Sequence, residues 1–166
     1  KHCGPNNCNK QSLDADIQVP NDALANVQYS FTFYINSGGN QHDSISLDVT
    51  VAAVHSAITT LPSDSQTGKF TQIVQFPLSI KNTGNIRDTL VLDVCNPNIN
   101  TSCSTPAWNA SFSNQQGNTI FSLTLDPDEI GNIFVDIQVE DPFDNSEEYF
   151  EIRVGIIGSN FESTEL

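Results

Sequence analysis

The sequence has no methionine, only one tryptophan and few basic residues. Against six lysines and arginines it carries 20 aspartates and glutamates, so its formal net charge is −14. This shortage of positive charge excludes nucleic acid and anionic membranes as partners, because both require patches of Lys and Arg. There is no run of about 18 apolar residues, so we expect no membrane-spanning segment. The acidic surface serves solubility or attracts cations.

The chain begins with KHCGPNNC, which is neither a translation start nor a signal peptide. We interpret the chain as a processed product or as part of a longer protein. Its four cysteines do not have the spacing of a zinc site, and we predict two local disulfides, which are typical of oxidising extracellular compartments. Four cysteines allow three connectivities. The predicted disulfide cysteines are Cys3, Cys8, Cys95 and Cys103. The triplets NTS and NAS predict N-glycosylation at Asn100 and Asn109.

Alternation of apolar and polar residues dominates the chain and predicts half-buried β-strands. Gly, Asn, Asp and Pro separate the alternating segments, and no segment has helical spacing. Strands at this spacing indicate an antiparallel β-sandwich and an all-β fold. The predicted strands lie within 29–35, 45–51, 76–80, 90–94, 121–125, 133–139 and 150–156.

Two residues in the stretch FPLSIKNTGNIRDTLVLDV (76–94) carry specific expectations. We expect Gly84 to supply the positive φ of a tight hairpin turn, with the flanking asparagines tolerating the turn. Pro77 interrupts an alternating run, and proline in a strand is tolerated on an edge or at a bulge. We therefore expect the chain to bend or to change sheets near Pro77.

An internal repeat predicts the domain organisation. The segment LANVQYSFTF (24–33) matches IGNIFVDIQV (130–139), and SISLDVTV (44–51) matches YFEIRVGI (149–156). A cysteine pair precedes each copy, which favours pairing Cys3 with Cys8 and Cys95 with Cys103. We expect one complete sandwich repeat at 57–158, preceded by a partial repeat at 1–56 and followed by a tail or linker at 159–166.

A partial sandwich would expose an unpaired strand edge and an uncovered apolar face. Three arrangements would cover them. The missing strands could lie upstream in a longer polypeptide, they could come from a neighbouring subunit by strand addition, or the first strands could pack against the complete repeat as one enlarged sandwich.

The motifs LSIKNTGNIRDTLVLDV (78–94), WNASFS (108–113) and LTLDPDEIGNIFVDIQV (123–139) give the chain a family resemblance. It resembles the immunoglobulin-like modules of archaeal and bacterial cell-surface proteins, including the type associated with alpha-galactosidases. The resemblance implies an immunoglobulin-like β-sandwich and no shared catalytic residues. The turn PDEIG and the cysteine loop before Trp108 depart from the family pattern.

Nothing in the sequence marks a catalytic centre. The histidines His2, His42 and His55 have no paired acid nearby in sequence, and there is no nucleophile elbow or phosphate loop. Trp108 is expected in the core between sheets, with sugar stacking as the alternative. The acidic loops form either a solvated rim or a calcium site that bridges subunits, because Ca²⁺ takes six to eight oxygen ligands. The candidate calcium ligands are Asp126, Asp128, Glu129, Asp141, Asp144 and Glu147.

From the sequence we expect a non-enzymatic, extracellular protein of the cell surface, archaeal rather than bacterial. Its expected role is that of a structural subunit or fragment of a surface layer, sheath or filament that self-associates through strand or face packing. No cofactor is required, with calcium as the candidate cation. Its expected partners are other copies of itself, N-linked glycans and divalent cations. The alternative is an adhesin or a carbohydrate-binding accessory module of a secreted protein.

Overall fold

The computed structural model describes residues 14–95, 108–140, 148–158 and 162–165. Within them the protein is all-β, with antiparallel pairing throughout, as the sequence predicts. The same residues contain no helix that is long and apolar enough to cross a membrane. The strands are β1 (Gln28–Ser37), β2 (Asn40–Thr50), β3 (Ala57–Thr60), β4 (Ile73–Asn82), β5 (Asp88–Cys95), β6 (Ala110–Ser113), β7 (Thr119–Ile120), β8 (Ser122–Leu125), β9 (Ile130–Gln138), β10 (Glu151–Ile156) and β11 (Glu162–Glu165).

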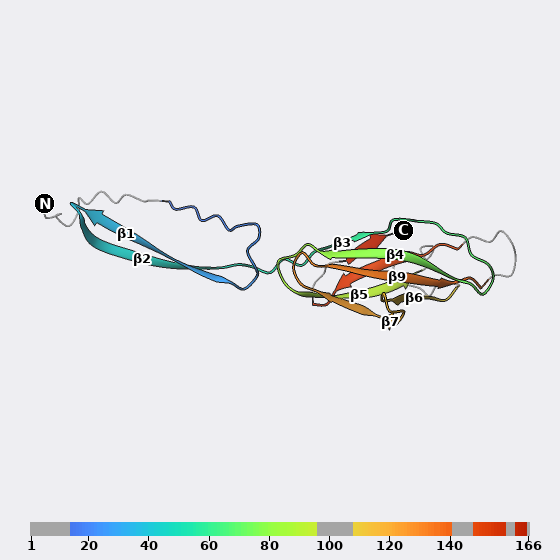
Figure 1. Cartoon of the computed structure of the whole chain (residues 1–166). Coiled ribbons are helices and arrows are strands. Elements are labelled where there is room, and N and C mark those ends of the chain that lie inside the picture. The colour runs from blue at the N-terminus through green and yellow to red at the C-terminus, as the bar shows by residue number, and fades with distance from the viewer. Residues whose placement is uncertain (1–13, 96–107, 141–147, 159–161, 166) are drawn as a thin grey trace.

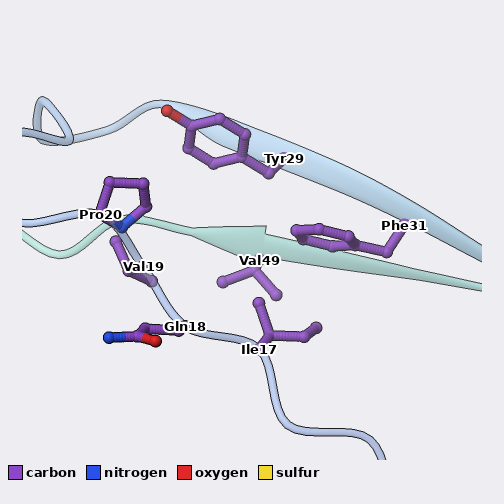
Figure 2. A pocket seen from close by; sticks show the side chains of 7 residues that line it. All are labelled: Ile17, Gln18, Val19, Pro20, Tyr29, Phe31 and Val49. Atoms are coloured by element: carbon purple, nitrogen blue, oxygen red, sulfur yellow. The ribbon is translucent and has the colours of Figure 1, made fainter.

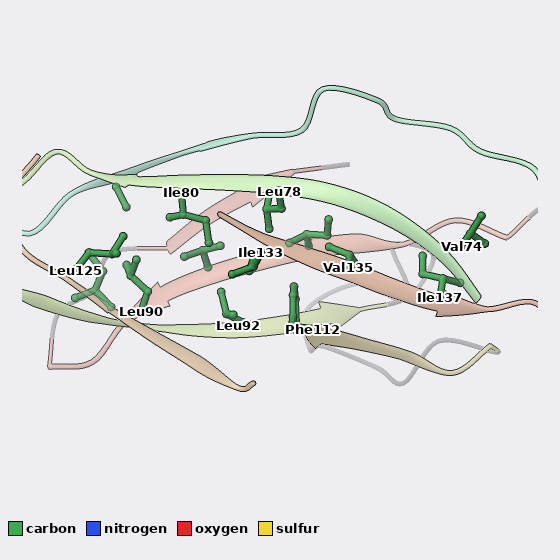
Figure 3. Packing of buried hydrophobic residues seen from close by; sticks show 14 of the residues in the cluster. Val74, Leu78, Ile80, Leu90, Leu92, Phe112, Leu125, Ile133, Val135 and Ile137 are labelled. Carbon is green, nitrogen blue, oxygen red and sulfur yellow. The ribbon is translucent and has the colours of Figure 1, made fainter. Parts of the chain in front are cut away.

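Strands β3 to β11 form a two-sheet sandwich. One sheet has the order β3-β4-β9-β6-β7 and the other the order β11-β10-β5-β8. The alternating side chains of both sheets meet in one core, seen in Figure 3. Burying an aliphatic side chain of this size contributes roughly 1.5–3 kcal/mol, so the alternation holds the sheets together. The most completely buried apolar residues are Leu78, Ile80, Leu90, Val135 and Val154.

The turn NTGN (82–85) connects the two sheets and does not close a hairpin. Strands β4 and β5 lie on either side of it in the sequence but belong to different sheets. Gly84 is therefore not needed for a positive φ, and that expectation was wrong, since the positive-φ glycines of the described chain lie elsewhere. A Cβ on Gly84 would instead approach the carbonyl oxygen of Val54 to 2.3 Å. Glycine is required here because another segment of backbone passes so close.

Pro77 lies on the open side of β4, which continues through it in one sheet, so the expected change of sheet near Pro77 was wrong. Strand β4 pairs with β9 along residues 73–81, but β3 covers it only from Ser79 to Asn82. The carbonyl of Gln75, which points to the open side, accepts a hydrogen bond from the Gln66 side chain at 2.8 Å. Since alternate residues point the same way, the nitrogen of Pro77 also faces this open side, where no ladder hydrogen bond is lost.

Strands β1 and β2 form a separate two-stranded sheet that projects from one end of the sandwich (Figure 1). Below, the β1–β2 hairpin is called the ribbon. Its tip is the turn at 36–40, where Gly38 and Gly39 have φ values of 58° and 84°. Among the described strands, those of the ribbon pair with no strand of either sheet of the sandwich. The enlarged single sandwich, one of the three expected arrangements, is therefore not what the structure shows.

The structure also departs from the sequence analysis at the C-terminal end. The segment 159–166 was expected to be a tail or linker, but Glu162–Glu165 forms strand β11, which pairs with β10. The sandwich thus extends beyond the predicted boundary at residue 158. Strands β3, β6, β7 and β11, which have two to four residues each, were not predicted.

Candidate assembly surface

The ribbon collects apolar side chains on one face. The register of the two strands sets Tyr29 opposite Val49, Phe31 opposite Leu47 and Phe33 opposite Ile45. Since successive residues of a strand point to opposite faces, these three pairs lie on the same side of the ribbon. Aromatic and β-branched residues opposite one another stabilise a strand pair by roughly 0.2–1 kcal/mol for each pair. The ribbon apolar face is defined by Tyr29, Phe31, Phe33, Ile35, Ile45, Leu47 and Val49.

The opposite face of the ribbon is polar and hydrogen-bonded across the strands. The hydroxyl of Ser30 donates to Asp48 Oδ1 at 2.6 Å, and the hydroxyls of Thr32 and Ser46 lie 3.1 Å apart. These side chains are all exposed. The ribbon therefore has one face suited to water and one suited to burial, like a strand pair from a sandwich.

The ribbon apolar face is nevertheless largely uncovered. Ile35 and Ile45 are each 60% exposed and Leu47 is 44% exposed. The repeat aligns Leu47 with Ile152 of the sandwich, which is only 5% exposed. The two aligned positions thus differ, since one is buried in the sandwich and the other is open to solvent on the ribbon. A large exposed apolar patch of this kind marks an interaction site in a stable protein.

The strands that the sequence repeat aligns are arranged differently in the ribbon and in the sandwich. In the sandwich, β9 and β10 lie in opposite sheets, and both contribute side chains to the core. Their sequence counterparts, β1 and β2, are instead hydrogen-bonded to each other along the whole ribbon. Because both strands of the ribbon turn their apolar residues to the same side, the hairpin cannot bury them within itself.

The chain upstream of the ribbon covers only one end of its apolar face. Ile17 and Val19, with Gln18 and Pro20, run alongside Tyr29, Phe31 and Val49, and Ile17 points toward Val49 in Figure 2. These seven residues enclose an open hollow of about 250 Å³ that is lined almost entirely by carbon. The part of the face nearer the tip has no such cover within the described residues.

One asparagine joins the base of the ribbon to the sandwich. The side chain of Asn85 accepts a hydrogen bond from Val54 N and donates to the carbonyl oxygens of Ala23 and Ala52, at 2.8, 3.2 and 3.1 Å. Its backbone accepts from Ala25 N and donates to the Val54 carbonyl. The segments entering and leaving the ribbon are therefore both tied to the NTGN turn. We call these contacts the Asn85 joint.

A buried carboxylate lies close to this joint. His55 Nδ1 lies 2.8 Å from Asp88 Oδ1, and the Asp88 side chain is only 4% exposed. The second oxygen of Asp88 has no hydrogen-bond partner in the described part of the protein. The sequence shows no acid paired with His55, and the structure supplies Asp88 as its partner. The contact joins residues 33 positions apart, which sequence spacing alone does not reveal.

The sandwich edges are short, whereas the ribbon edges are long. The outermost strands of the two sandwich sheets are short: β3, β8 and β11 have four residues each, and β7 has two. The ribbon strands have 10 and 11 residues, and neither pairs with a further strand within the described chain. Short edge strands are a common protection against unwanted pairing. The ribbon edges are not protected by short length.

The predicted calcium ligands are only partly described. Asp141, Asp144 and Glu147 lie outside the described residues. The other three have partners within the protein: Asp126 lies 3.6 Å from Arg87, Asp128 lies 2.7 Å from Lys81, and Glu129 accepts a hydrogen bond from the Asp126 backbone. Among the residues that the structure describes, no three His, Cys, Asp or Glu side chains form a group that could hold a metal. The calcium site stays a prediction.

The remaining predicted positions are divided in the same way. Five of the positions lie outside the described residues, namely His2, Cys3, Cys8, Asn100 and Cys103. Cys95 ends β5, is fully buried and is disulfide-bonded. Asn109 is exposed and its side-chain amide donates to Glu140. The pairing of the cysteines and the glycosylation of both asparagines remain predictions.

Trp108 lies against the core, half-buried, with its ring tilted by 53° to that of Phe150 and the ring centroids 6.5 Å apart. This placement agrees with a packing role.

No protein-family model matches the chain, and no curated protein is significantly similar to it. The resemblance to immunoglobulin-like surface modules therefore depends on the strand pattern and its motifs alone.

Proposed function

We propose that this protein is a non-enzymatic structural subunit of an extracellular assembly, which self-associates through its ribbon. The observation that carries the proposal is the ribbon apolar face, which remains exposed on a two-stranded sheet. An isolated two-stranded hairpin is only marginally stable in water. Because the upstream chain covers only one end of this face, the remaining apolar side chains need a partner to cover them.

The rest of the molecule supports an assembly role. The sandwich has a closed core and short edges, so it can act as a rigid body that carries the ribbon. The Asn85 joint holds the ribbon in a defined direction relative to the sandwich. The expected disulfides and glycosylation sites agree with an extracellular location, which belongs to the proposal together with the surface-layer or filament role.

The alternative function is an adhesin or a carbohydrate-binding accessory module, for which Trp108 is the candidate sugar-stacking residue. Trp108 packs against the core and Phe150, which favours a packing role over sugar stacking. Assembly through the ribbon is the function that we propose.

The test compares two charge substitutions at adjacent positions of β2. Leu47→Asp places a carboxylate on the ribbon apolar face, and Ser46→Asp places the same charge on the polar face. Electron microscopy and sedimentation of the native protein should show regular assemblies or oligomers. We expect Leu47→Asp to abolish them and Ser46→Asp to retain them. A native protein that stays monomeric at millimolar concentration would contradict the proposal.

A further inference from the structure

We propose that the outer edge of β1 pairs antiparallel with the same edge of a second copy of this chain. The two copies would be related by a two-fold axis that lies midway between their Thr32 residues. The two ribbons would then form one four-stranded sheet with the order β2-β1-β1-β2. This inference rests on the proposed function, and it specifies which edge associates, with what partner and in what register.

Charge distinguishes the two edges of the ribbon. Strand β1 (QYSFTFYINS) contains no charged residue, although the chain has a net charge of −14. Strand β2 carries Asp43 and Asp48, so two copies pairing through β2 would place four carboxylates along one contact and would set like charges opposite one another in some registers. Like charges opposite one another destabilise a strand pair. The edge of β1 also contains no proline, lysine or bulge before Ile35 that would block pairing.

The outward hydrogen-bonding groups follow from the ladder of the ribbon. Val51 N donates to the Val27 carbonyl at 3.0 Å, so Val27 faces β2. In an antiparallel pair the inward-facing and outward-facing residues alternate. Ser30, Thr32 and Tyr34 therefore present their N–H and C=O groups to the free edge. By the same alternation, Ser46, which is opposite Thr32, faces outward from β2.

The register follows from this alternation and from the length of the strand. Outward residues must pair with outward residues, and an axis at Thr32 pairs Ser30 with Tyr34 of the second copy. It also sets Phe31 beside Phe33 and Tyr29 beside Ile35 on the same face. This alignment uses the regular part of β1 almost completely, because the bulge begins between Ile35 and Asn36. Contacts related by a two-fold axis are the commonest form of subunit interface.

The outer edge of β1 could pair with either the ribbon or the sandwich of a second copy. The short edges of the sandwich favour the ribbon. Where β4 extends beyond β3, the Gln66 side chain and Pro77 occupy the open side. A ribbon that approached the sandwich would find at most four residues to pair with at β3, β8 or β11. A second β1 offers a full-length, uncharged edge. Pairing would also join two apolar faces into one wide face, available for stacking in a larger assembly.

The test uses matched substitutions on the two outer edges. Thr32→Cys should give a disulfide-linked dimer under mild oxidation, because the two Cα atoms across the axis would lie about 5.5 Å apart. Ser46→Cys should not, because the two positions would be separated by three strand spacings, about 14 Å. The unsubstituted protein under the same conditions shows any dimer formed by the native cysteines.

A second pair of variants tests the hydrogen bonds without a cross-link. Thr32→Pro and Ser46→Pro each remove an outward N–H, leave the β1–β2 ladder intact and lose the same Thr32–Ser46 side-chain contact. We expect Thr32→Pro to weaken self-association about thirtyfold, because two hydrogen bonds at the axis are lost. Ser46→Pro should change it by less than about threefold. Sedimentation equilibrium measures both, and circular dichroism confirms the fold.

Failure of the inference is separable from failure of the proposed function. If the native protein assembles but Ser46→Cys cross-links and Ser46→Pro dissociates it, the pairing edge is β2 and the inference is wrong. If it assembles and neither edge responds, for example because another segment of a longer chain covers β1, the inference is also wrong. If the native protein does not assemble at all, the proposed function fails with it.

Discussion

At the scale of single residues, the contact between His55 and Asp88 links the segment after the ribbon to the first residue of β5. Asp88 is almost fully buried, and a buried carboxylate is costly unless it is hydrogen-bonded. The imidazole of His55 is the partner that the structure gives to one of its two oxygens. This pair therefore stabilises the sandwich next to the place where the ribbon begins.

We predict that His55→Ala lowers the free energy of unfolding by ~2 kcal/mol, because the loss of one partner leaves a buried carboxylate unsatisfied. Chemical denaturation monitored by fluorescence of Trp108 measures the change. The double variant His55→Ala/Asp88→Asn should recover part of the loss, since a neutral amide costs less to bury than a charge.

Arg87→Ala provides the control for this experiment. Arg87 is next to Asp88 in sequence, but its contact with Asp126 is solvent-exposed at 3.6 Å. Exposed ion pairs contribute about 1 kcal/mol or less, so this variant should be nearly neutral. Equal losses for His55→Ala and Arg87→Ala would show that the buried pair has no special role.

At the scale of elements, the Asn85 joint decides whether the ribbon and the sandwich move as one body. Three side-chain hydrogen bonds of a single residue hold Ala23, Ala52 and Val54. We predict that Asn85→Ala leaves the sandwich folded but loosens the ribbon. Hydrogen exchange should show faster exchange of the Val54 amide, with unchanged protection in β4 and β9.

Asn114→Ala is the matched control, because Asn114 also accepts backbone hydrogen bonds in a turn, from Gln116 and Asn118, but away from the ribbon. It should not alter exchange at Val54. An Asn85→Ala protein that retains full protection at Val54 would show that the remaining backbone contacts of residues 83–85 suffice to hold the ribbon.

The sequence predicted the faces of the long strands well and their partners poorly. Alternation shows which side chains of 133–139 point to the core, and the structure confirms this for Ile133, Val135 and Ile137. Alternation carries no information about which strand lies alongside. The direct pairing of β1 with β2, unlike that of their counterparts in the repeat, was therefore not predicted.

The turn NTGN shows the same limit. Its residues fit a hairpin and an inter-sheet connection equally well, so the assignment of a positive φ to Gly84 was wrong. The close approach of the Val54 backbone, which requires glycine, depends on a segment 30 residues away. The candidate site was predicted only as an uncovered half-repeat. Its joint at Asn85 and its uncharged edge needed the register of the strands.

At the scale of the whole molecule, the net charge of −14 opposes any approach of two copies. We predict that self-association strengthens as NaCl is raised from 0.01 to 0.15 M, because the Debye length falls from about 30 to about 8 Å. Sedimentation equilibrium across this range measures the effect. Weaker association at higher salt would indicate instead that attractive ion pairs dominate the contact.

The same experiment tests the predicted calcium site. CaCl₂ and NaCl solutions of equal ionic strength should screen charge to a similar extent. If carboxylates such as Asp126, Asp141 and Asp144 bind calcium between subunits, CaCl₂ should strengthen association further, and chelation should reverse that gain. Equal association in the two salts would show that calcium acts only through screening.

The direction of the ribbon has a mechanical consequence. Strand β1 runs from the sandwich to the tip, so antiparallel pairing of two β1 edges would place the two sandwiches at opposite ends of the shared sheet. A force pulling the sandwiches apart would then act along the strands and load all the hydrogen bonds between the copies at once. Such a connection resists tension by shear, whereas a connection opened from one end would yield one bond at a time.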